Sequence, residues 1–390
     1  MKVLFFNYEY PPLGGGAAYA SQNILREYAK LPDIEVDFVT SSLDDQYHLE
    51  KMGENIRVHR LPIGKNKNNL TYQSQKDLLV YAWKSYFFSK KLICDAEKSG
   101  KKYDLTHSFF SVPCGFVSMI LKKKYKLPYI VSLRGSDVPG YSERFSFIYC
   151  FLKPIIVYIW KKASAVIANS SMLRDLAIKS NDKQKVGVIY NGINIEHFRP
   201  GAVPRVNNNF TILCASRLSR RKGFNYVIDA FDIIHEKYPD IKLVIAGGEG
   251  NAEEELKDQA KKLKLESKII FTGFVTPNTE FLKYYNTSDV FVFPSLNEGM
   301  SNNMLEAMAS GMPIIMTPTG GAEELIKDGV NGYIVKFKDS ADIAEKLEKL
   351  INNPELCKKM GEESRKIAEK MSWKSVADKY YYLYKQIIVS

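Results

Sequence analysis

Asp289-Val-Phe-Val-Phe-Pro-Ser295, followed closely by Glu298-Gly-Met-Ser-Asn-Asn-Met-Leu-Glu306, predicts a strand, a turn and a helix in succession. The apolar run before Pro294 has the character of a buried parallel strand. A helix is expected to begin near Ser301 and to stop at Gly311, because glycine is favoured just beyond a helix C-terminus. The two glutamates therefore bracket a strand-to-helix turn.

A helix N-terminus after a parallel strand is a favourable place for an anion. Its first backbone N–H groups have no partner within the helix, and the helix dipole favours negative charge there. Free amides of residues 299–303 are expected to point toward a diphosphate. Glu306, more than one turn into the helix, is placed to accept hydrogen bonds from ribose hydroxyls, and Glu298 to reach the hydroxyls of a sugar. The donor-binding candidates on this turn are Gly299, Met300, Ser301, Asn302 and Glu306.

The frame around the two glutamates reads Pro-Ser-x-x-Glu-Gly and then Glu-Ala-Met-Ala-x-Gly-x-Pro. This pattern resembles the signature of retaining glycosyltransferases of family 4, which have the GT-B fold. The resemblance implies an α/β protein with two Rossmann-like, doubly wound parallel-sheet domains that face an interdomain cleft. It also implies a C-terminal helix that crosses back to the N-terminal domain.

The alternation of short apolar strands and helical stretches independently favours a doubly wound α/β domain in each half. We expect residues 1–198 to form the acceptor domain and 210–370 the donor domain. The Pro-, Gly- and Asn-rich segment 199–209 has the composition of a linker. An aromatic helix within 371–390 is expected to return to the first domain. The expected strands are Val3–Phe6, Val36–Thr40, Ile56–Leu61, Tyr129–Leu133, Ala165–Ala168, Phe210–Ser216, Lys242–Ala246, Lys268–Thr272, Asp289–Phe293 and Pro313–Met316.

The net positive charge is confined to the first half. Residues 1–200 hold 29 Lys and Arg against 18 Asp and Glu, whereas residues 201–390 hold 26 of each. This asymmetry predicts an anionic partner for the N-terminal half, and nucleic acid and anionic lipid are both candidates. The five cysteines are scattered, and the chain opens with a strand-like segment, so we expect a reduced, cytoplasmic protein without a signal peptide.

A second cluster of donor-site candidates follows the first strand of the second half, in Ser216-Arg217-Leu-Ser-Arg-Arg-Lys222-Gly. Loops at the carboxyl ends of strands in open α/β sheets bind ligands. Arg217 and Lys222 are suited to clamp a diphosphate. The segment resembles the family's Gly-Arg-Leu…Lys-Gly motif, although serine stands at 216 in place of glycine. The resemblance also implies that Gly248 lies beside the nucleotide and that the backbone of Phe274 and Val275 contacts the base.

No metal site and no cofactor are expected. No Asp-x-Asp motif occurs near the donor elements. Fixed cations and a helix terminus would then stabilise the departing diphosphate, as Mg²⁺ does in metal-dependent transferases.

The acceptor-side candidates lie in two loops. Gly15 and Gly16 resemble the family's glycine loop facing the cleft. The segment beginning at Arg134 resembles its His-Gly-x-Asp loop, with arginine in place of histidine, so any role of Arg134 is electrostatic rather than that of a base. Asp137 is the candidate for contact with the reactive sugar or the acceptor hydroxyl. His107 is a second candidate there, with a purely structural histidine as the more ordinary interpretation.

The resemblance implies transfer of a hexose-type sugar from a UDP- or GDP-sugar with retention of configuration. The leaving diphosphate would accept the acceptor's proton without a protein nucleophile, and Glu298 would orient the donor sugar. Alternatives are a nucleotide-sugar epimerase of GT-B fold and a nucleic-acid-binding protein, for which no module is recognisable.

Basic and aromatic residues together suit an anionic membrane surface. They suggest peripheral association with the inner face of the cell membrane and a polyprenyl- or lipid-linked sugar acceptor in surface polysaccharide or glycolipid assembly. The same residues could equally form ordinary core helices with a solvated lysine face. The two stretches concerned are Phe145–Trp160 and the helix carrying Tyr81, Trp83, Tyr86, Phe87 and Phe88.

Overall fold

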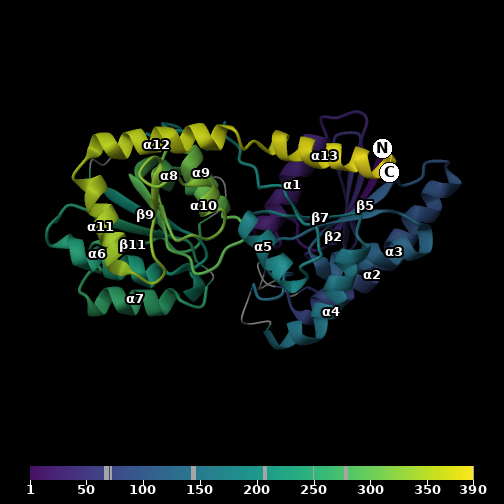
Figure 1. Ribbon diagram of the computed structural model, residues 1–390, viewed down its shortest axis with the longest axis horizontal. Coiled ribbons are helices and arrows are strands. Elements are labelled where there is room, and N and C mark those ends of the chain that lie inside the picture. Colours follow the sequence, from purple (N-terminus) through teal and green to yellow (C-terminus); the bar gives the residue numbers. More distant parts are fainter. Residues whose placement is uncertain are drawn as a thin grey trace. The chain divides into compact units, whose positions relative to one another are not determined.

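The computed structural model describes residues 1–65, 70, 73–141, 146–204, 209–248, 250–275 and 280–389, without the side chains of 146–150. Phe145 of the predicted aromatic stretch and residues 205–208 of the predicted linker lie outside the described residues. Contacts within the chain define two compact units. The N-terminal unit comprises Met1–Asn191 and Trp373–Ser390, and the C-terminal unit comprises Gly192–Ser372 (Figure 1).

The N-terminal unit is built on a sheet of order β3-β4-β2-β1-β5-β6-β7-β8. All neighbouring strands are parallel except β3, which pairs antiparallel with β4 at the edge. The chain runs from β1 outward to β2 and then crosses to β5 on the other side of β1, which is the doubly wound order that the sequence predicted. The strands are β1 Lys2–Phe6, β2 Glu35–Ser41, β3 His48–Met52, β4 Ile56–Leu61, β5 Leu105–Phe109, β6 Tyr129–Ser132, β7 Ala165–Ala168 and β8 Gly187–Val188.

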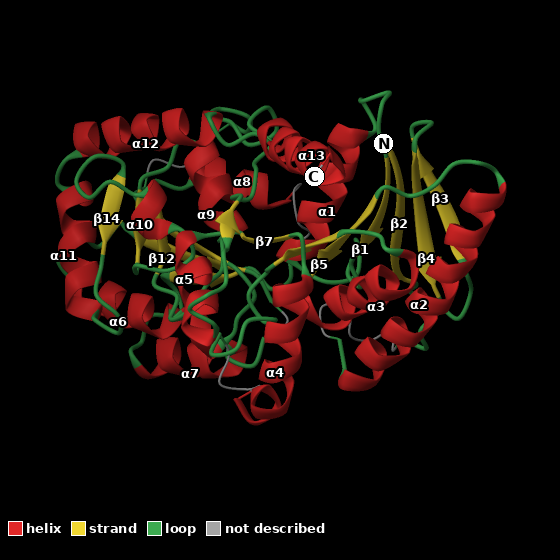
Figure 2. Ribbon diagram, turned by 45° about the vertical axis from the view of Figure 1, so that its right-hand side comes forward, coloured by secondary structure: helices red, strands yellow, loops and turns green. Residues whose placement is uncertain are grey.

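Helices cover both faces of this sheet, with α1 and α13 on one face and α2 and α3 on the other (Figure 2). The helices are α1 Gly16–Tyr28, α2 Gln75–Lys98, α3 Phe116–Tyr125, α4 Ser146–Lys162, α5 Ser171–Ser180 and α13 Trp373–Val389. Tyr81 on α2, named above among the aromatic residues suited to a membrane surface, is instead fully buried, and its hydroxyl donates to the Val39 carbonyl at 2.8 Å. In the part of the chain that the structure describes, no helix is both long and apolar enough to cross a membrane.

The C-terminal helix α13 completes the core of the N-terminal unit, as predicted. Tyr380 and Tyr384 are fully buried in the same apolar cluster as strands β1 and β5. The Tyr384 hydroxyl lies 2.6 Å from His107 Nδ1 on β5. Figure 1 shows this yellow helix beside the purple α1, with which it packs.

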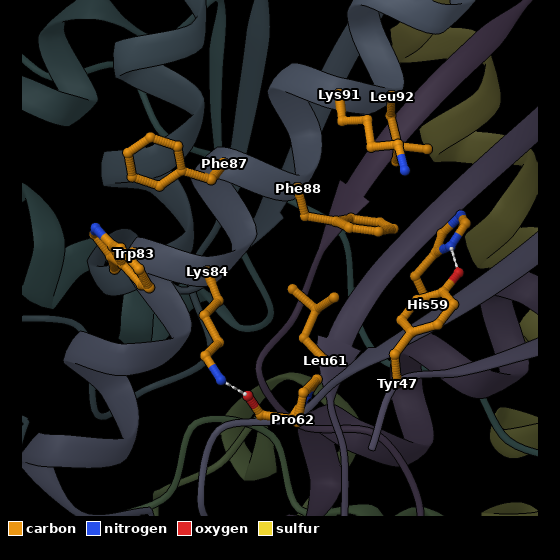
Figure 3. Close-up of a pocket in the computed structure, with 10 residues that line it drawn as sticks. All are labelled: Tyr47, His59, Leu61, Pro62, Trp83, Lys84, Phe87, Phe88, Lys91 and Leu92. Carbon is orange, nitrogen blue, oxygen red and sulfur yellow. Dashed lines mark hydrogen bonds between the residues drawn. The ribbon is translucent and has the colours of Figure 1, made fainter. Parts of the chain in front are cut away.

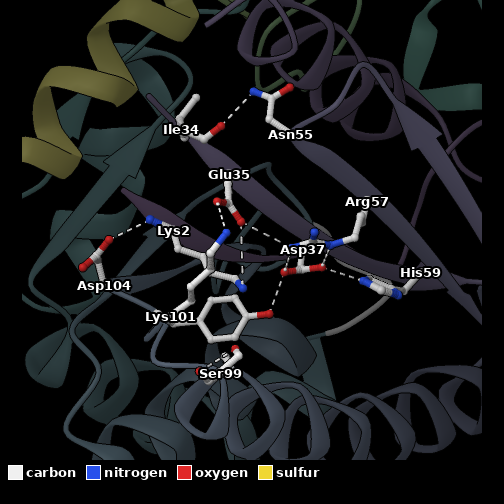
Figure 4. A network of polar contacts seen from close by, with 12 residues as sticks. Lys2, Ile34, Glu35, Asp37, Asn55, Arg57, His59, Ser99, Lys101 and Asp104 are labelled. Carbon is white, nitrogen blue, oxygen red and sulfur yellow. Dashed lines mark hydrogen bonds and ion pairs between the residues drawn. The ribbon is translucent and has the colours of Figure 1, made fainter. Parts of the chain in front are cut away.

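A buried carboxylate fixes the pairing of β2 with β4 in the N-terminal unit (Figure 4). Asp37 accepts hydrogen bonds from Arg57 at 2.7 and 2.9 Å, from His59 at 2.8 Å and from the Tyr103 hydroxyl at 2.6 Å. Burial alone would raise the pKa of Asp37, but these donors outweigh burial and lower it well below the ordinary value. The carboxylate therefore stays charged and holds the two strands and the α2–β5 connection together.

The C-terminal unit has a fully parallel sheet of order β11-β10-β9-β12-β13-β14. The chain leaves β9 toward one edge and then crosses to β12 on the other side, so the loops after β9 and β12 emerge at neighbouring positions. Its elements are β9 Thr211–Ala215, η3 Arg220–Lys222, α6 Phe224–His235, β10 Lys242–Ala246, α7 Glu253–Lys262, β11 Ile269–Phe271, α8 Glu280–Thr287, β12 Val290–Phe293, α9 Asn302–Ala309, β13 Ile314–Met316, α10 Ala322–Leu325, β14 Gly332–Ile334, α11 Ser340–Ile351 and α12 Pro354–Glu369.

Helix α9 has the limits that its sequence signals predict. Ser301 caps its N-terminus, with its hydroxyl accepting from the Met304 amide at 3.2 Å. The helix ends at Ala309, and Gly311 has a φ of +78°, the left-handed conformation that favours glycine beyond a helix C-terminus.

Candidate active site

Two predicted donor-site residues from different loops meet in the C-terminal unit. Lys222 ends the short η3 turn after β9, and Glu298 lies in the loop after β12. Their side chains form a buried ion pair between Lys222 Nζ and Glu298 Oε1, with each residue only 7% exposed. The Ser295 hydroxyl donates to the same carboxylate oxygen at 3.0 Å. The doubly wound strand order brings these loops together.

The charges of this pair are set by burial and by mutual attraction. Burial alone would raise the pKa of Glu298, but the Lys222 ammonium and the nearby Arg221 lower it. Burial lowers the pKa of Lys222 more than the Glu298 carboxylate raises it. Removing either partner would leave a buried charge without compensation, which proteins tolerate poorly.

Backbone packing holds the two loops in contact. Gly223, directly after Lys222, has a φ of +71°, and a Cβ there would overlap the Pro294 carbonyl oxygen at the end of β12. The Leu296 amide donates to the Arg221 carbonyl at 2.7 Å. Glycine at 223 is therefore required both by conformation and by the close approach of the neighbouring chain.

The turn into α9 is covered by the loop after β13. A Cβ on Gly320 would lie 2.5 Å from the Cβ of Glu298, and one on Gly321 would lie 2.7 Å from the Met300 methyl group. The Ser301 amide donates to the Gly320 carbonyl at 3.3 Å, so the expectation of a free amide is wrong at Ser301. Gly299 and Met300 are buried beneath this cover, and Asn302 is the first residue of the helix.

Glu306 lies within α9, and its Oε2 accepts from the Tyr285 hydroxyl of α8 at 2.9 Å. Asn303 donates to the same hydroxyl at 3.2 Å. Burial raises the pKa of Glu306 to about 7, although the bond from Tyr285 opposes this shift. The two glutamates therefore differ, because Glu298 is held ionised by a cation and Glu306 titrates near neutrality.

The predicted base-contacting segments lie at the ends of two adjacent strands. Gly247 pairs with Gly273 in an isolated bridge, and a Cβ on Gly248 would lie 2.8 Å from the Phe274 amide nitrogen. The Phe274 side chain is exposed, whereas Val275 is buried. Arg217 is exposed, and its side chain forms no ion pair with the described residues.

Asp137 of the N-terminal unit is held by its own surroundings. Its Oδ2 accepts from the Ser111 amide at 2.8 Å and the Ser111 hydroxyl at 2.9 Å. Its Oδ1 accepts from the amides of Arg134 at 2.9 Å and Gly135 at 3.1 Å. Burial nevertheless raises the pKa of Asp137. The carboxylate ties the loop after β6 to the loop after β5.

Arg134 lies beside this carboxylate with its guanidinium stacked 3.4 Å from the centroid of the Phe109 ring. It donates from Nη1 to Asn191 Oδ1 at 2.9 Å and from Nη2 to the Tyr380 hydroxyl at 3.5 Å. Arg134 and Asp137 thus occupy one loop at the carboxyl end of the sheet, as predicted.

The other candidates of the N-terminal unit lie on strand β5 or at the start of the helix after β1, and these two strands are neighbours in its sheet. Gly16 begins α1, and the Gly15 amide donates to the Glu9 carboxylate at 3.4 Å. His107 is fully buried between Tyr384 and Ser132, which matches its structural interpretation. Burial lowers the pKa of His107, so the imidazole is neutral.

Sequence reasoning missed the residues that hold the candidates in place. Ser295 belongs to the Pro-Ser-x-x-Glu-Gly pattern, but the pattern does not indicate its hydrogen bond to Glu298. Tyr285, Ser111 and Tyr380 carry no local motif that would indicate Glu306, Asp137 and Arg134 as their partners. Among the described residues, no three His, Cys, Asp or Glu side chains gather as metal ligands.

Comparison with known proteins agrees with this arrangement. The family model described as glycosyltransferase family 4 matches residues 14–197, and the model described as glycosyl transferases group 1 matches residues 199–367. An uncharacterized glycosyltransferase of Methanocaldococcus jannaschii is 30% identical over 96% of this chain and 95% of its own length. The chain belongs to glycosyltransferase family 4. It is therefore a glycosyltransferase of a retaining family.

A further relative of this family-4 glycosyltransferase and one solved structure of similar fold are informative. The capsular polysaccharide biosynthesis glycosyltransferase CapM of Staphylococcus aureus is 29% identical, covering 65% of this chain and 67% of CapM. The crystal structure of Anabaena HepE in complex with UDP-glucose matches with a TM-score of 0.75 at 21% identity, covering 99% of this chain and 100% of HepE. The two Rossmann-like parallel-sheet units, with the C-terminal helix packed in the first, are those of the GT-B fold.

Proposed function

We propose that this enzyme transfers a hexose-type sugar from a UDP- or GDP-sugar to a hydroxyl of a lipid-linked sugar acceptor, with retention of configuration. The observation that carries the donor half of this proposal is the buried Lys222–Glu298 pair next to the N-terminus of α9. A cation and a helix N-terminus can bind the diphosphate, and a neighbouring carboxylate can accept hydrogen bonds from the sugar hydroxyls.

In the proposed donor complex, the diphosphate binds Lys222, Arg217 and amides at the start of α9. Lys222 then exchanges its bond to Glu298 for a bond to phosphate, and the released Glu298 carboxylate orients hydroxyls of the donor sugar. Glu306 accepts hydrogen bonds from the ribose. The backbone of Gly248, Phe274 and Val275 contacts the base.

In the proposed reaction, the bond between the anomeric carbon and the diphosphate oxygen breaks while the acceptor oxygen attacks from the same face. The leaving diphosphate takes the acceptor's proton. Because the acceptor oxygen itself attacks the anomeric carbon, no protein side chain acts as a nucleophile. Fixed cations stabilise the developing charge on the diphosphate. Because these cations supply the stabilisation, we expect activity to persist in EDTA; its complete loss, restored by Mg²⁺, would contradict this part.

A thermal-shift panel of UDP, GDP, UDP-glucose and GDP-mannose tests the donor proposal. One nucleotide series should raise the melting temperature, and Lys222→Gln should abolish that rise. Because HepE binds UDP-glucose, UDP is the first nucleotide to examine. Release of UDP or GDP only when acceptor is added would separate a transferase from an epimerase.

Exposed apolar side chains on the N-terminal unit support the membrane part of the proposal. Leu79, Trp83 and Phe87 recur at every fourth position of α2 and are 73%, 64% and 50% exposed. On α4, Phe151, Ile155 and Tyr158 are also exposed. The lysines near these residues are Lys84, Lys90, Lys91, Lys153, Lys161 and Lys162.

Beside the α2 stripe lies a groove of about 610 Å³, which we call the aromatic groove. Its lining is Tyr47, His59, Leu61, Pro62, Trp83, Lys84, Phe87, Phe88, Lys91 and Leu92. Figure 3 shows Phe88 and Leu61 between the α2 side and the Tyr47–His59 side, where the Tyr47 hydroxyl lies 2.8 Å from His59 Nδ1. Apolar surface rimmed by lysine suits the interface of an anionic bilayer.

Surface association would bring the acceptor domain to a lipid-linked acceptor, and the likeness to CapM favours a role in surface polysaccharide assembly. Sedimentation with phosphatidylserine vesicles and with phosphatidylcholine vesicles tests this. The double variant Trp83→Ala/Phe87→Ala should lose most binding to the anionic vesicles. Tyr382→Ala, which removes an equally exposed aromatic ring from α13, should retain it. Binding that is equal in all three proteins would contradict docking through α2.

A further inference from the structure

We infer that Arg134 forms a subsite for an anionic group of the acceptor, a carboxylate or a phosphate, and that Tyr380 of the C-terminal helix positions its guanidinium. This inference rests on the proposed transferase function and specifies the chemical class of acceptor. It concerns the N-terminal unit alone.

The first observation is that no described carboxylate lies within ion-pair distance of the guanidinium, although the charge of Asp137 acts on it and opposes the lowering of the Arg134 pKa by burial. Arg134 forms no ion pair with any carboxylate of the described residues. The nearby Asp137 directs its oxygens to Ser111 and to two loop amides. Within the described part of the chain, both hydrogen-bond partners of the Arg134 side chain are neutral, namely the Asn191 amide oxygen and the Tyr380 hydroxyl.

The second observation is unused hydrogen-bonding capacity. Arg134 Nε is shielded from solvent and has no hydrogen-bond partner among the described residues, although almost every such buried donor in proteins is paired. Nη1 and Nη2 each use one of their two N–H groups. A guanidinium whose Nε and one terminal nitrogen carry unpaired N–H groups presents the fork that binds two oxygens of one carboxylate or phosphate.

The third observation is that the Arg134 guanidinium is already fixed in position by its neighbours before any ligand binds. One face stacks on Phe109 of β5, and the two terminal nitrogens are anchored to Asn191 and to Tyr380. A long cationic side chain normally loses much conformational freedom on binding, and this loss has already occurred here. Such fixation suits recognition of a ligand rather than a solvated surface charge.

Tyr380 is itself fixed by a buried network. Its hydroxyl accepts from the Ser132 hydroxyl at 3.0 Å, and Ser132 contacts His107 Nε2 at 2.8 Å. Tyr384, one turn further along α13, contacts the other nitrogen of His107 but not Arg134. The two tyrosines therefore form a matched pair, of which only Tyr380 hydrogen-bonds to the guanidinium.

The placement of Arg134 favours the acceptor as the source of the anion. The loop follows β6 in the unit that carries the whole positive excess of the chain, whereas the donor candidates Lys222 and Glu298 lie in the other unit. An acidic sugar and a carrier phosphate offer the same pair of anionic oxygens. A suitable experiment distinguishes these two sources.

The test is binding of three probes by saturation-transfer NMR: methyl glucuronide, glucose 1-phosphate and the neutral methyl glucoside. At least one anionic probe should bind wild-type protein about tenfold more tightly than methyl glucoside. Preference for glucuronide indicates an acidic acceptor sugar, and preference for the phosphate indicates a carrier phosphate. Arg134→Gln should remove the preference, and Lys183→Gln, which removes an exposed charge from the same unit, should keep it.

Tyr380→Phe should reduce the preference several-fold without weakening methyl glucoside, whereas Tyr384→Phe should leave the preference unchanged. A merely structural defect would weaken all three probes alike. The inference is overturned if wild-type protein shows no anionic preference, if Arg134→Gln retains it, or if Arg134→Gln weakens UDP or GDP instead. Failure of wild-type protein to bind any nucleotide would contradict the proposed function separately, because that measurement involves no acceptor probe.

Discussion

Lys222 and Glu298, which are 76 positions apart, neutralise each other inside the C-terminal unit. Each charge is buried, so neither is adequately solvated without the other. The pair occupies the place where a diphosphate and a sugar are proposed to bind. Donor binding must therefore replace one ionic contact by another.

Variants of the pair should separate binding from turnover. Glu298→Gln should lower kcat by about 100-fold while UDP or GDP still binds, because the diphosphate itself becomes the counter-ion of Lys222. Lys222→Gln should weaken nucleotide binding and cost about 3–5 kcal/mol of unfolding free energy, since Glu298 is left buried without its cation. In a double-mutant cycle the double variant should recover part of this stability. Additive losses would contradict the coupling.

Glu306 should make donor binding depend on pH. With a pKa of about 7 it is protonated below neutrality, so affinity for the nucleotide sugar should rise as pH increases through about 7, when the carboxylate becomes the stronger acceptor for ribose hydroxyls. Glu306→Gln should flatten the profile and raise KM for the donor, and Glu323→Gln, an exposed control, should not. Isothermal titration calorimetry from pH 5.5 to 8.5 would provide the measurement.

The raised pKa of Glu306 also predicts that the stability of the protein changes with pH, in the direction opposite to donor affinity. The folded protein holds the Glu306 proton more tightly than the unfolded chain does, so this residue's contribution to stability falls as pH rises from its ordinary value of 4.5 to about 7. Tyr285→Phe removes a hydrogen bond that lowers the Glu306 pKa, and should shift both profiles to higher pH. An unchanged midpoint in Tyr285→Phe would show that the hydroxyl does not act on this carboxyl.

Gly223→Ala should disturb the donor site by overlap with the Pro294 carbonyl oxygen. Gly201 has the same φ of +71° but open space around its Cβ position, so Gly201→Ala measures the conformational cost alone. We expect that cost to be about 1–2 kcal/mol. Gly223→Ala should lose more stability and also weaken nucleotide binding. Equal behaviour of the two variants in urea unfolding and thermal shift would rule out the steric explanation.

Removal of the Tyr384 ring should destabilise the N-terminal unit. Tyr384 is fully buried against β5, so Tyr384→Ala should cost about 3–5 kcal/mol. Tyr382, on the exposed side of the same helix, is the control, and Tyr382→Ala should change stability by less than about 0.5 kcal/mol. Urea unfolding followed by tryptophan fluorescence would measure both. Similar losses would mean that the helix is held by something other than its buried rings.

Local signals made α9 and the two-glutamate turn predictable, because a cap, a glycine and a proline mark the limits of a helix wherever it lies. The aromatic helix Trp373–Val389 was predicted from its run of apolar and aromatic residues, and its return to the first domain from the family resemblance. The limits of strand β5 were not predicted because its sequence, Leu105-Thr-His-Ser-Phe109, places polar side chains in a fully buried strand. Strand β3 was missed because its charged residues lie at an exposed sheet edge.

Contacts between distant segments were not predictable from periodicity or motif. The pairing of Lys222 with Glu298 depends on the strand order that places β9 beside β12. Tyr81 looked like its exposed neighbours on α2, since the run of aromatics does not indicate which face of a helix meets the sheet. The environment of Arg134 likewise combines Phe109, Asn191 and Tyr380 from three separate parts of the chain.

The return of α13 to the N-terminal unit has a consequence for biosynthesis. Domains of many proteins fold as they leave the ribosome, in order from the N-terminus. Here the first domain to emerge lacks Tyr380 and Tyr384 until the rest of the polypeptide has been translated. The core around His107 is therefore incomplete until the final helix has been made. A truncated nascent chain that ends before Trp373 should therefore expose this apolar surface and recruit chaperones, even with every donor-site residue already made.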